Sequence, residues 1–116
     1  ILSGGRKGDL GRDANVDRSI NTALEVVDFF ERKEPDLRIR HDEILIEKSL
    51  ELGSNLIIAP DGISGNLIYR TLVHLGKGKA YGAIYMGLDK IIIDTSRVGE
   101  LSELIGALSL AYALCQ

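Results

Sequence analysis

The sequence predicts an α/β domain with three layers, in which helices cover both faces of a mixed, mostly parallel sheet. Short runs of β-branched and leucine residues at 56–58 and 91–93 are typical of strands that are covered on both faces. Segments with apolar residues at helical spacing separate the expected strands, which indicates parallel βαβ units. With 116 residues the chain is long enough for one core, so we expect a single domain over residues 1–116.

Composition and charge narrow the class of protein. The content of 45% hydrophobic and 27% charged residues is ordinary for a globular domain, and a net charge of -3 provides no general attraction to nucleic acid or an acidic membrane. We find no apolar run long enough to cross a bilayer and no signal peptide. Cys115, the only cysteine, cannot form an intrachain disulfide, and no metal-ligand spacing occurs, so we expect a cytoplasmic protein without a metal.

The chain begins with Ile1 rather than Met, inside an expected strand over residues 1–3. We therefore expect a fragment that lacks an N-terminal domain and contacts that domain in the intact protein. A glycine-rich loop with the basic residues Arg6, Lys7 and Arg12 follows, and such loops can hold a phosphate. A flexible surface loop is the alternative, because the glycine spacing matches neither the dinucleotide-binding nor the Walker pattern.

Two helices and a short strand are expected next. Asp13 or Asn15 can cap a first helix, and Pro35 prevents its continuation. Residues 37–40 alternate between apolar and basic side chains, which predicts a short, half-exposed strand. A second helix is expected to end at Gly53.

The stretch over residues 54–78 organises the predicted fold as strand, tight loop, helix and stop. Pro60 ends the strand, Asp61 is a residue type typical of turns and helix N-caps, and Gly65 allows a close approach of another backbone segment. Gly76 begins the glycine stop of the helix. Open α/β sheets bind ligands in such loops, and the helix dipole favours an anion there.

The C-terminal part predicts a hairpin followed by a buried helix. The turn at residues 87–89 is so short that the strands at 80–86 and 91–93 must be antiparallel. The last helix, over residues 101–115, is apolar nearly all round, which is typical of a helix that is covered on every side. We therefore expect a homodimer, a covering domain, or both.

The segment after the second hairpin strand is a candidate anion site. Ser96 and Arg97 offer a hydroxyl and a planar guanidinium fork, which can donate to the same phosphate or carboxylate. Helix capping by Asp94 or Ser96, with Arg97 paired to Asp94 or Glu100, is an equal alternative.

The sequence APDGISGN at residues 59–66 resembles the strand–turn–helix of the phosphate acetyl/butyryl transferase family, in which a Pro-Asp pair precedes a Gly-Asn pair. Gly82, Gly87, Lys90 and the block around Arg97 follow in the same order. The resemblance is greatest to a methanogen branch, the MtxX-type methanogenesis marker proteins, which are named methyltransferases. It implies an isocitrate-dehydrogenase-like fold and a homodimer, with an interdomain cleft in which a coenzyme A thiolate attacks an acyl phosphate.

The resemblance also implies roles for individual residues. Those expected to bind the substrate or its phosphate are Ser96, Arg97, Asp61, Gly65 and Asn66. Glu103 maps onto an acidic residue that assists thiol deprotonation and is the expected catalytic residue. Departures from the family pattern are Val98 and Gly99, where the family has Gly and then Cys.

Two hypotheses about function result. In the first, the domain transfers an acyl or methyl group, binds a small phosphate-bearing substrate and uses coenzyme A. In the second, it is a non-catalytic binding or regulatory subunit associated with methanogenesis that keeps the phosphate pocket. Methyl transfer follows from the resemblance alone, because the sequence has no GxGxG loop for S-adenosylmethionine and no DxHxxG motif for cobalamin.

Overall fold

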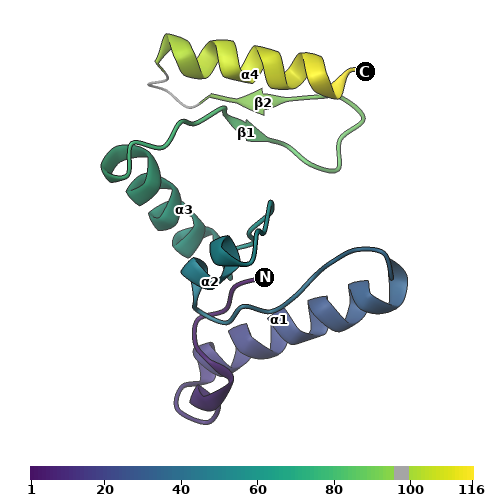
Figure 1. Cartoon of the computed structure of the whole chain (residues 1–116), viewed down its shortest axis with the longest axis vertical. Coiled ribbons are helices and arrows are strands. Elements are labelled where there is room, and N and C mark those ends of the chain that lie inside the picture. Colours follow the sequence, from purple (N-terminus) through teal and green to yellow (C-terminus); the bar gives the residue numbers. More distant parts are fainter. Residues whose placement is uncertain (96–99) are drawn as a thin grey trace. The chain divides into compact units, whose positions relative to one another are not determined.

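A computed structural model describes the chain except for residues 96–99. The chain divides into two compact units, unit 1 (Ile1–Ile68) and unit 2 (Tyr69–Gln116). In chain order the elements are η1 (Lys7–Asp9), α1 (Ala14–Lys33), α2 (Ile46–Glu51), α3 (Gly62–Arg70), η2 (Thr71–Leu75), β1 (Ala83–Ile84), β2 (Ile93–Asp94) and α4 (Leu101–Leu114) (Figure 1).

The prediction of a three-layer, mostly parallel, isocitrate-dehydrogenase-like sheet is wrong. Within the described residues the only sheet is the antiparallel pair β1–β2, in which Ala83 lies opposite Asp94 and Ile84 opposite Ile93. The antiparallel direction of this hairpin is confirmed, although each strand is only two residues long. The expected strand over residues 37–40 is also not formed.

The missing sheet has a physical reason in unit 1. Leu2 N donates to Ile58 O at 2.9 Å and Ser3 N donates to Glu43 O at 2.8 Å, so residues 1–3 join two distant segments. Asp42 N also donates to Ile1 O at 3.0 Å, so residues 1–3 pair with residues 40–43 on one side, but this pairing is only a few residues long and the bond to Ile58 stands alone, so no sheet extends from it. A run of apolar residues predicts that a segment is buried. A strand needs, in addition, a neighbouring segment whose backbone forms consecutive hydrogen bonds with its N–H and C=O groups.

Helix α1 begins where the sequence predicts. The Asp13 carboxylate accepts hydrogen bonds from Asn15 N at 2.8 Å and Val16 N at 3.1 Å, which satisfies two N–H groups that have no partner inside the helix. Its buried residues are Ile20 and Ala23, which belong to the small core of unit 1.

The helix predicted after residue 62 is observed as α3 followed by the π-helical segment η2, and it ends at Gly76 as expected. Gly78 N donates to Leu72 O at 2.8 Å, a bond that closes the last turn. Between the glycines, Lys77 takes the left-handed conformation with φ of 57°. A Cβ at Gly76 would lie 2.8 Å from Leu72 O, so the stop requires glycine at this position.

Unit 2 is built by packing the hairpin onto α4 (Figure 1). A Cβ added to Gly106 would lie 2.1 Å from Cδ1 of Tyr81, because the tyrosine ring lies directly on this residue. Gly106 and Ala107 are the buried residues of α4, whereas Leu101 and Leu108 are each 72% exposed. The described chain therefore does not cover α4 on every side, and the homodimer stays a prediction.

Candidate functional site

The predicted site residues fall into three groups. Asp61, Gly65 and Asn66 lie together at the start of α3 in unit 1, and Glu103 lies in the first turn of α4 in unit 2. Ser96 and Arg97 lie outside the described residues, so their role in phosphate binding stays a prediction. Glu100 occupies the N-cap position of α4, so the alternative in which Asp94 caps this helix is wrong.

Asp61 stabilises the start of α3. Its carboxylate accepts a hydrogen bond from Ser64 N at 2.7 Å, and its backbone oxygen accepts one from Gly65 N at 3.0 Å. The bond from the Ser64 backbone holds the pKa of Asp61 below its ordinary value, so the side chain is anionic at neutral pH. The carboxylate thus occupies a donor that a phosphate at this helix end would use.

Gly65 and Asn66 follow on α3. A Cβ on Gly65 would lie 3.4 Å from the Cβ of Ala59, so this glycine brings α3 against the preceding segment. Asn66 is exposed. Substrate binding by Asp61, Gly65 and Asn66 stays a prediction.

The glycine-rich loop of unit 1 uses its backbone donors internally. Arg6 N donates to the Asp9 carboxylate at 2.8 Å, and Gly11 N donates to Asp17 at 2.9 Å. The Arg12 guanidinium also pairs with Asp9, at 2.8 Å. Phosphate-binding loops direct such N–H groups at the ligand, so this loop in its present conformation is closed by its own carboxylates.

A hollow of about 500 Å³ in unit 2, the unit 2 hollow, contains the remaining predicted residue. Half-buried Glu103 lines it from α4, together with residues from the end of α3, from η2 and from the start of the hairpin segment. Its charged or titratable lining consists of Arg70, His74, Lys79, Glu100 and Glu103, beside the rings of Tyr69 and Tyr81.

Both signs of charge line the unit 2 hollow without neutralising one another by direct pairing. Among the described residues, none of the five charged or titratable side chains forms an ion pair or a side-chain hydrogen bond. Arg70 and Lys79 therefore remain available to an anionic group. The Glu103 carboxylate remains available to accept a proton or a hydrogen bond.

Three of these residues, Arg70, His74 and Lys79, were not among the site residues predicted from the sequence. The helical spacing of the sequence could have indicated two of them, because Arg70 and His74 are four residues apart and so lie on one face of the helix. His74 also lies in η2, and π-helical turns occur frequently at functional sites. Lys79 follows the glycine stop, where no periodicity marks it.

Two features are absent from the part of the chain that the structure describes. None of the described helices combines the length and the apolar character that crossing a membrane requires. In the same part of the chain, no group of three or more His, Cys, Asp or Glu residues could hold a metal ion.

Comparison with known proteins gives three informative matches. The chain is 47% identical over 116 residues to a protein of Methanosarcina mazei named "Putative methyltransferase mtx subunit X". It is 50% identical over 99 residues to an uncharacterized methyltransferase of Methanocaldococcus jannaschii. A phosphate acetyltransferase of Acetivibrio thermocellus is 32% identical over 63 residues, which are 54% of this chain and 19% of the enzyme.

The first two matches cover 98% and 84% of this chain but only 39% of each relative, so the chain spans about two fifths of their length. No family model matches the chain, and no solved structure matches it. The predicted resemblance to the mtx subunit X proteins, and more distantly to phosphate acetyltransferase, is confirmed.

Proposed function

We propose that this chain, a homologue of the mtx subunit X proteins over nearly its whole length, is part of a transferase that binds a phosphate-bearing ligand. Group transfer is what the names of its relatives have in common, since they include methyltransferases and a phosphate acetyltransferase. The observation that carries the proposal is the unit 2 hollow, where unpaired cations and the unpaired Glu103 line one space.

The cations of the hollow suit a phosphate. Arg70 presents a planar fork of N–H donors, and Lys79 adds a second positive charge. These charges would offset the negative charge that develops on a departing phosphate. Ser96 and Arg97 would be further phosphate ligands, on the basis of the family resemblance alone.

Glu103 is the proposed general base. Coenzyme A would supply a thiol as the nucleophile, and the Glu103 carboxylate would take the thiol proton. In acyl transfer a carbon–sulfur bond then forms at the acyl carbon as the bond to the phosphate oxygen breaks. The cations would hold the phosphate as it leaves with the bonding electron pair.

A non-catalytic subunit is the second candidate function. The relatives from Methanosarcina are named as a subunit, which favours assembly with other chains. Leu101 and Leu108 of α4 are largely exposed in the described chain, so this helix could provide the assembly surface. Such a protein would keep the phosphate pocket and regulate or anchor a partner in methanogenesis.

Calorimetric titration of the full-length protein with coenzyme A, acetyl phosphate and S-adenosylmethionine distinguishes these functions. Binding of the first two, weakened in Arg70→Gln, supports acyl transfer, and binding of S-adenosylmethionine alone supports methyl transfer. Arg32→Gln, which removes an exposed guanidinium from α1, serves as the control for Arg70→Gln. If none of the three ligands binds, the transferase proposal fails and the non-catalytic subunit is favoured.

A further inference from the structure

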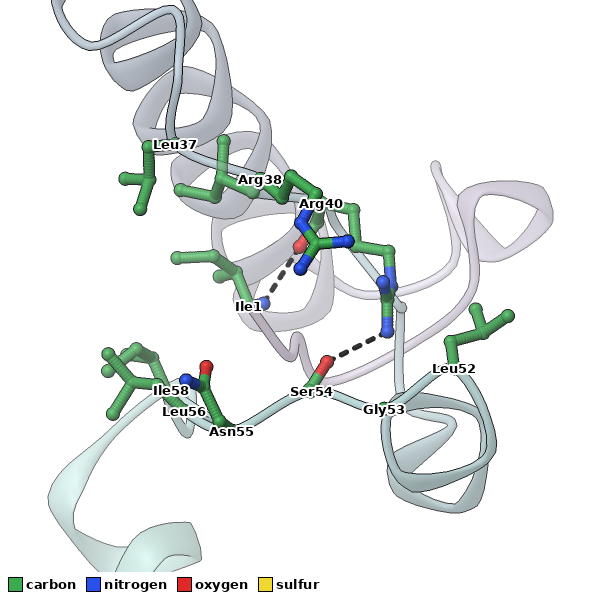
Figure 2. A pocket seen from close by; sticks show the side chains of 11 residues that line it. Ile1, Leu37, Arg38, Arg40, Leu52, Gly53, Ser54, Asn55, Leu56 and Ile58 are labelled. Atoms are coloured by element: carbon green, nitrogen blue, oxygen red, sulfur yellow. Dashed lines mark hydrogen bonds between the residues drawn. The ribbon is translucent and has the colours of Figure 1, made fainter.

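A second hollow, in unit 1, combines apolar walls with two arginines. This hollow, of about 380 Å³, lies between the segment after α1 and the segment after α2, and we call it the arginine hollow (Figure 2). Its volume falls in the range of small-molecule sites. The large apolar side chains that line it include Leu37, Leu52, Leu56 and Ile58, and Leu56 is 71% exposed.

Arg40 is held firmly at the edge of this hollow. Its Nε donates to Asp42 at 2.8 Å, and Nη2 donates to Ser54 Oγ at 2.8 Å, as the dashed line in Figure 2 shows. Asp42 is only 1% exposed and accepts a further bond from Ser49 Oγ at 2.7 Å. Within the described residues, Nη1 of Arg40 has no partner, so a rigid donor is left for a ligand.

The Asp42–Arg40 pair keeps its charges at neutral pH. Burial opposes ionisation of Asp42, but the hydrogen bonds from Ser49 and Arg40 outweigh it and hold the pKa of Asp42 below its ordinary value. Asp42 therefore stays anionic and fixes Arg40 through its Nε.

Arg38 adds a second positive charge to the arginine hollow. Its guanidinium forms no hydrogen bond or ion pair with any described residue, and its side chain lies over the hollow beside Arg40 (Figure 2). No carboxylate is among the residues that line the hollow. Asp42 pairs with Arg40 but does not line the hollow, so the charge that its lining presents is positive and favours an anion.

We propose that the arginine hollow binds a small organic anion with an apolar chain, whose head contacts Arg38 and Arg40 while its chain lies against Leu56 and Ile58. Guanidinium forks bind carboxylates and phosphates alike, and burial of the apolar chain is favourable. Because Arg40 is already fixed by Asp42, little conformational entropy is lost at this donor on binding. The inference is independent of the proposed transfer function, since it involves no residue of the unit 2 hollow.

The test titrates the full-length protein with octanoate, using octanol as the uncharged control and acetate as the control without a long chain. We expect octanoate to bind and both controls to bind at least tenfold more weakly. Arg38→Gln should weaken octanoate binding about tenfold, because one charge-assisted hydrogen bond is lost. The control Arg32→Gln removes an equal charge from an exposed pair with Asp28 on α1 and should leave octanoate binding unchanged.

A second variant tests the apolar wall. Leu56→Ser should weaken octanoate binding several-fold without changing the far-ultraviolet circular dichroism, because the side chain is largely exposed. Octyl phosphate measured beside octanoate shows which head is preferred, and tighter binding of either supports an anion site. The inference fails if octanoate does not bind, if octanol binds equally well, or if Arg38→Gln binds octanoate as the parent protein does.

Discussion

The carboxylates of the two units are used in different ways. In unit 1, Asp13 caps α1, Asp61 caps α3 and Asp42 pairs with Arg40. In unit 2, Glu100 and Glu103 line a hollow beside cations and have no side-chain partner within the described chain. These acidic side chains thus stabilise the local chain in unit 1, whereas the two glutamates of unit 2 stay available to a ligand, and the difference lies in the partners that surround each carboxylate.

The largest expected effect is on the stability of unit 1. Asp42→Ala should lower the free energy of unfolding by about 3 kcal/mol, because it leaves Arg40 and the buried Ser49 hydroxyl without their acceptor. Denaturant unfolding measures this change. Asp28→Ala, which removes an exposed partner of Arg32, should cost no more than about 1 kcal/mol. Equal losses of unfolding free energy in the two variants would show that the buried Asp42–Arg40 pair stabilises the protein no more than the exposed Asp28–Arg32 pair.

Acidification should disrupt the Asp42–Arg40 ion pair without a mutation, by protonating Asp42. Since the pKa of Asp42 is lowered by folding, the unfolded chain binds the proton more readily, and the stabilisation is present above the unfolded value of 3.8. It is lost as the pH falls from 3.8 through the lower pKa of the folded state. Unfolding measured from pH 7 to pH 2 should show a smaller acid slope in Asp42→Asn than in the parent protein; identical slopes would contradict this role.

In unit 2, Glu103→Gln should affect activity rather than stability. If Glu103 is the general base, the turnover rate with acyl phosphate and coenzyme A should fall about 100-fold or more. The free energy of unfolding should change by less than about 0.5 kcal/mol, because no described hydrogen bond is lost. A stability loss like that of Asp42→Ala would place Glu103 with the structural carboxylates of unit 1.

A helix cap should give a smaller effect than the buried pair. Asp13→Ala should destabilise the protein by about 1 kcal/mol, since two N–H groups of α1 lose their acceptor. Asp36→Ala, in the exposed segment after α1, is the matched control and should lie within about 0.5 kcal/mol of the parent. Thermal unfolding of both variants measures the difference in their stability. If Asp13→Ala is as stable as Asp36→Ala, water replaces the Asp13 carboxylate as hydrogen-bond acceptor at the helix end.

The smallest expected effect is a gain of stability in unit 2. Lys77→Gly should stabilise the protein by about 0.5–1 kcal/mol, because Lys77 has a φ of 57° that glycine adopts without a steric cost. Lys90→Gly provides the control, because Lys90 is not among the residues with positive φ and should gain nothing. Equal shifts in the two midpoints of thermal unfolding would exclude the conformational explanation.

Local signals in the sequence determined the start of α1, the end of the helix formed by α3 and η2, and the hairpin. The Asp13 cap, the glycine stop at Gly76 and the antiparallel hairpin are decided by atoms within a few residues of each other, so the sequence suffices to predict them. The catalytic role of Glu103 was predicted from the family resemblance and stays a prediction. The roles predicted for Ser96 and Arg97 rest on the resemblance as well, and these residues lie outside the described part.

Only the tertiary structure decided which distant groups meet. The apolar run at 56–58 indicated a covered strand, but its pairing depends on neighbours that the run itself does not specify. In the same way, the contact of Tyr81 with Gly106 selects the face of α4 that is buried, and the Arg40–Asp42 pair requires Ser49 and Ser54 from another segment. Periodicity identifies an apolar or charged side chain, whereas packing between segments decides whether that side chain is covered, paired or left for a ligand.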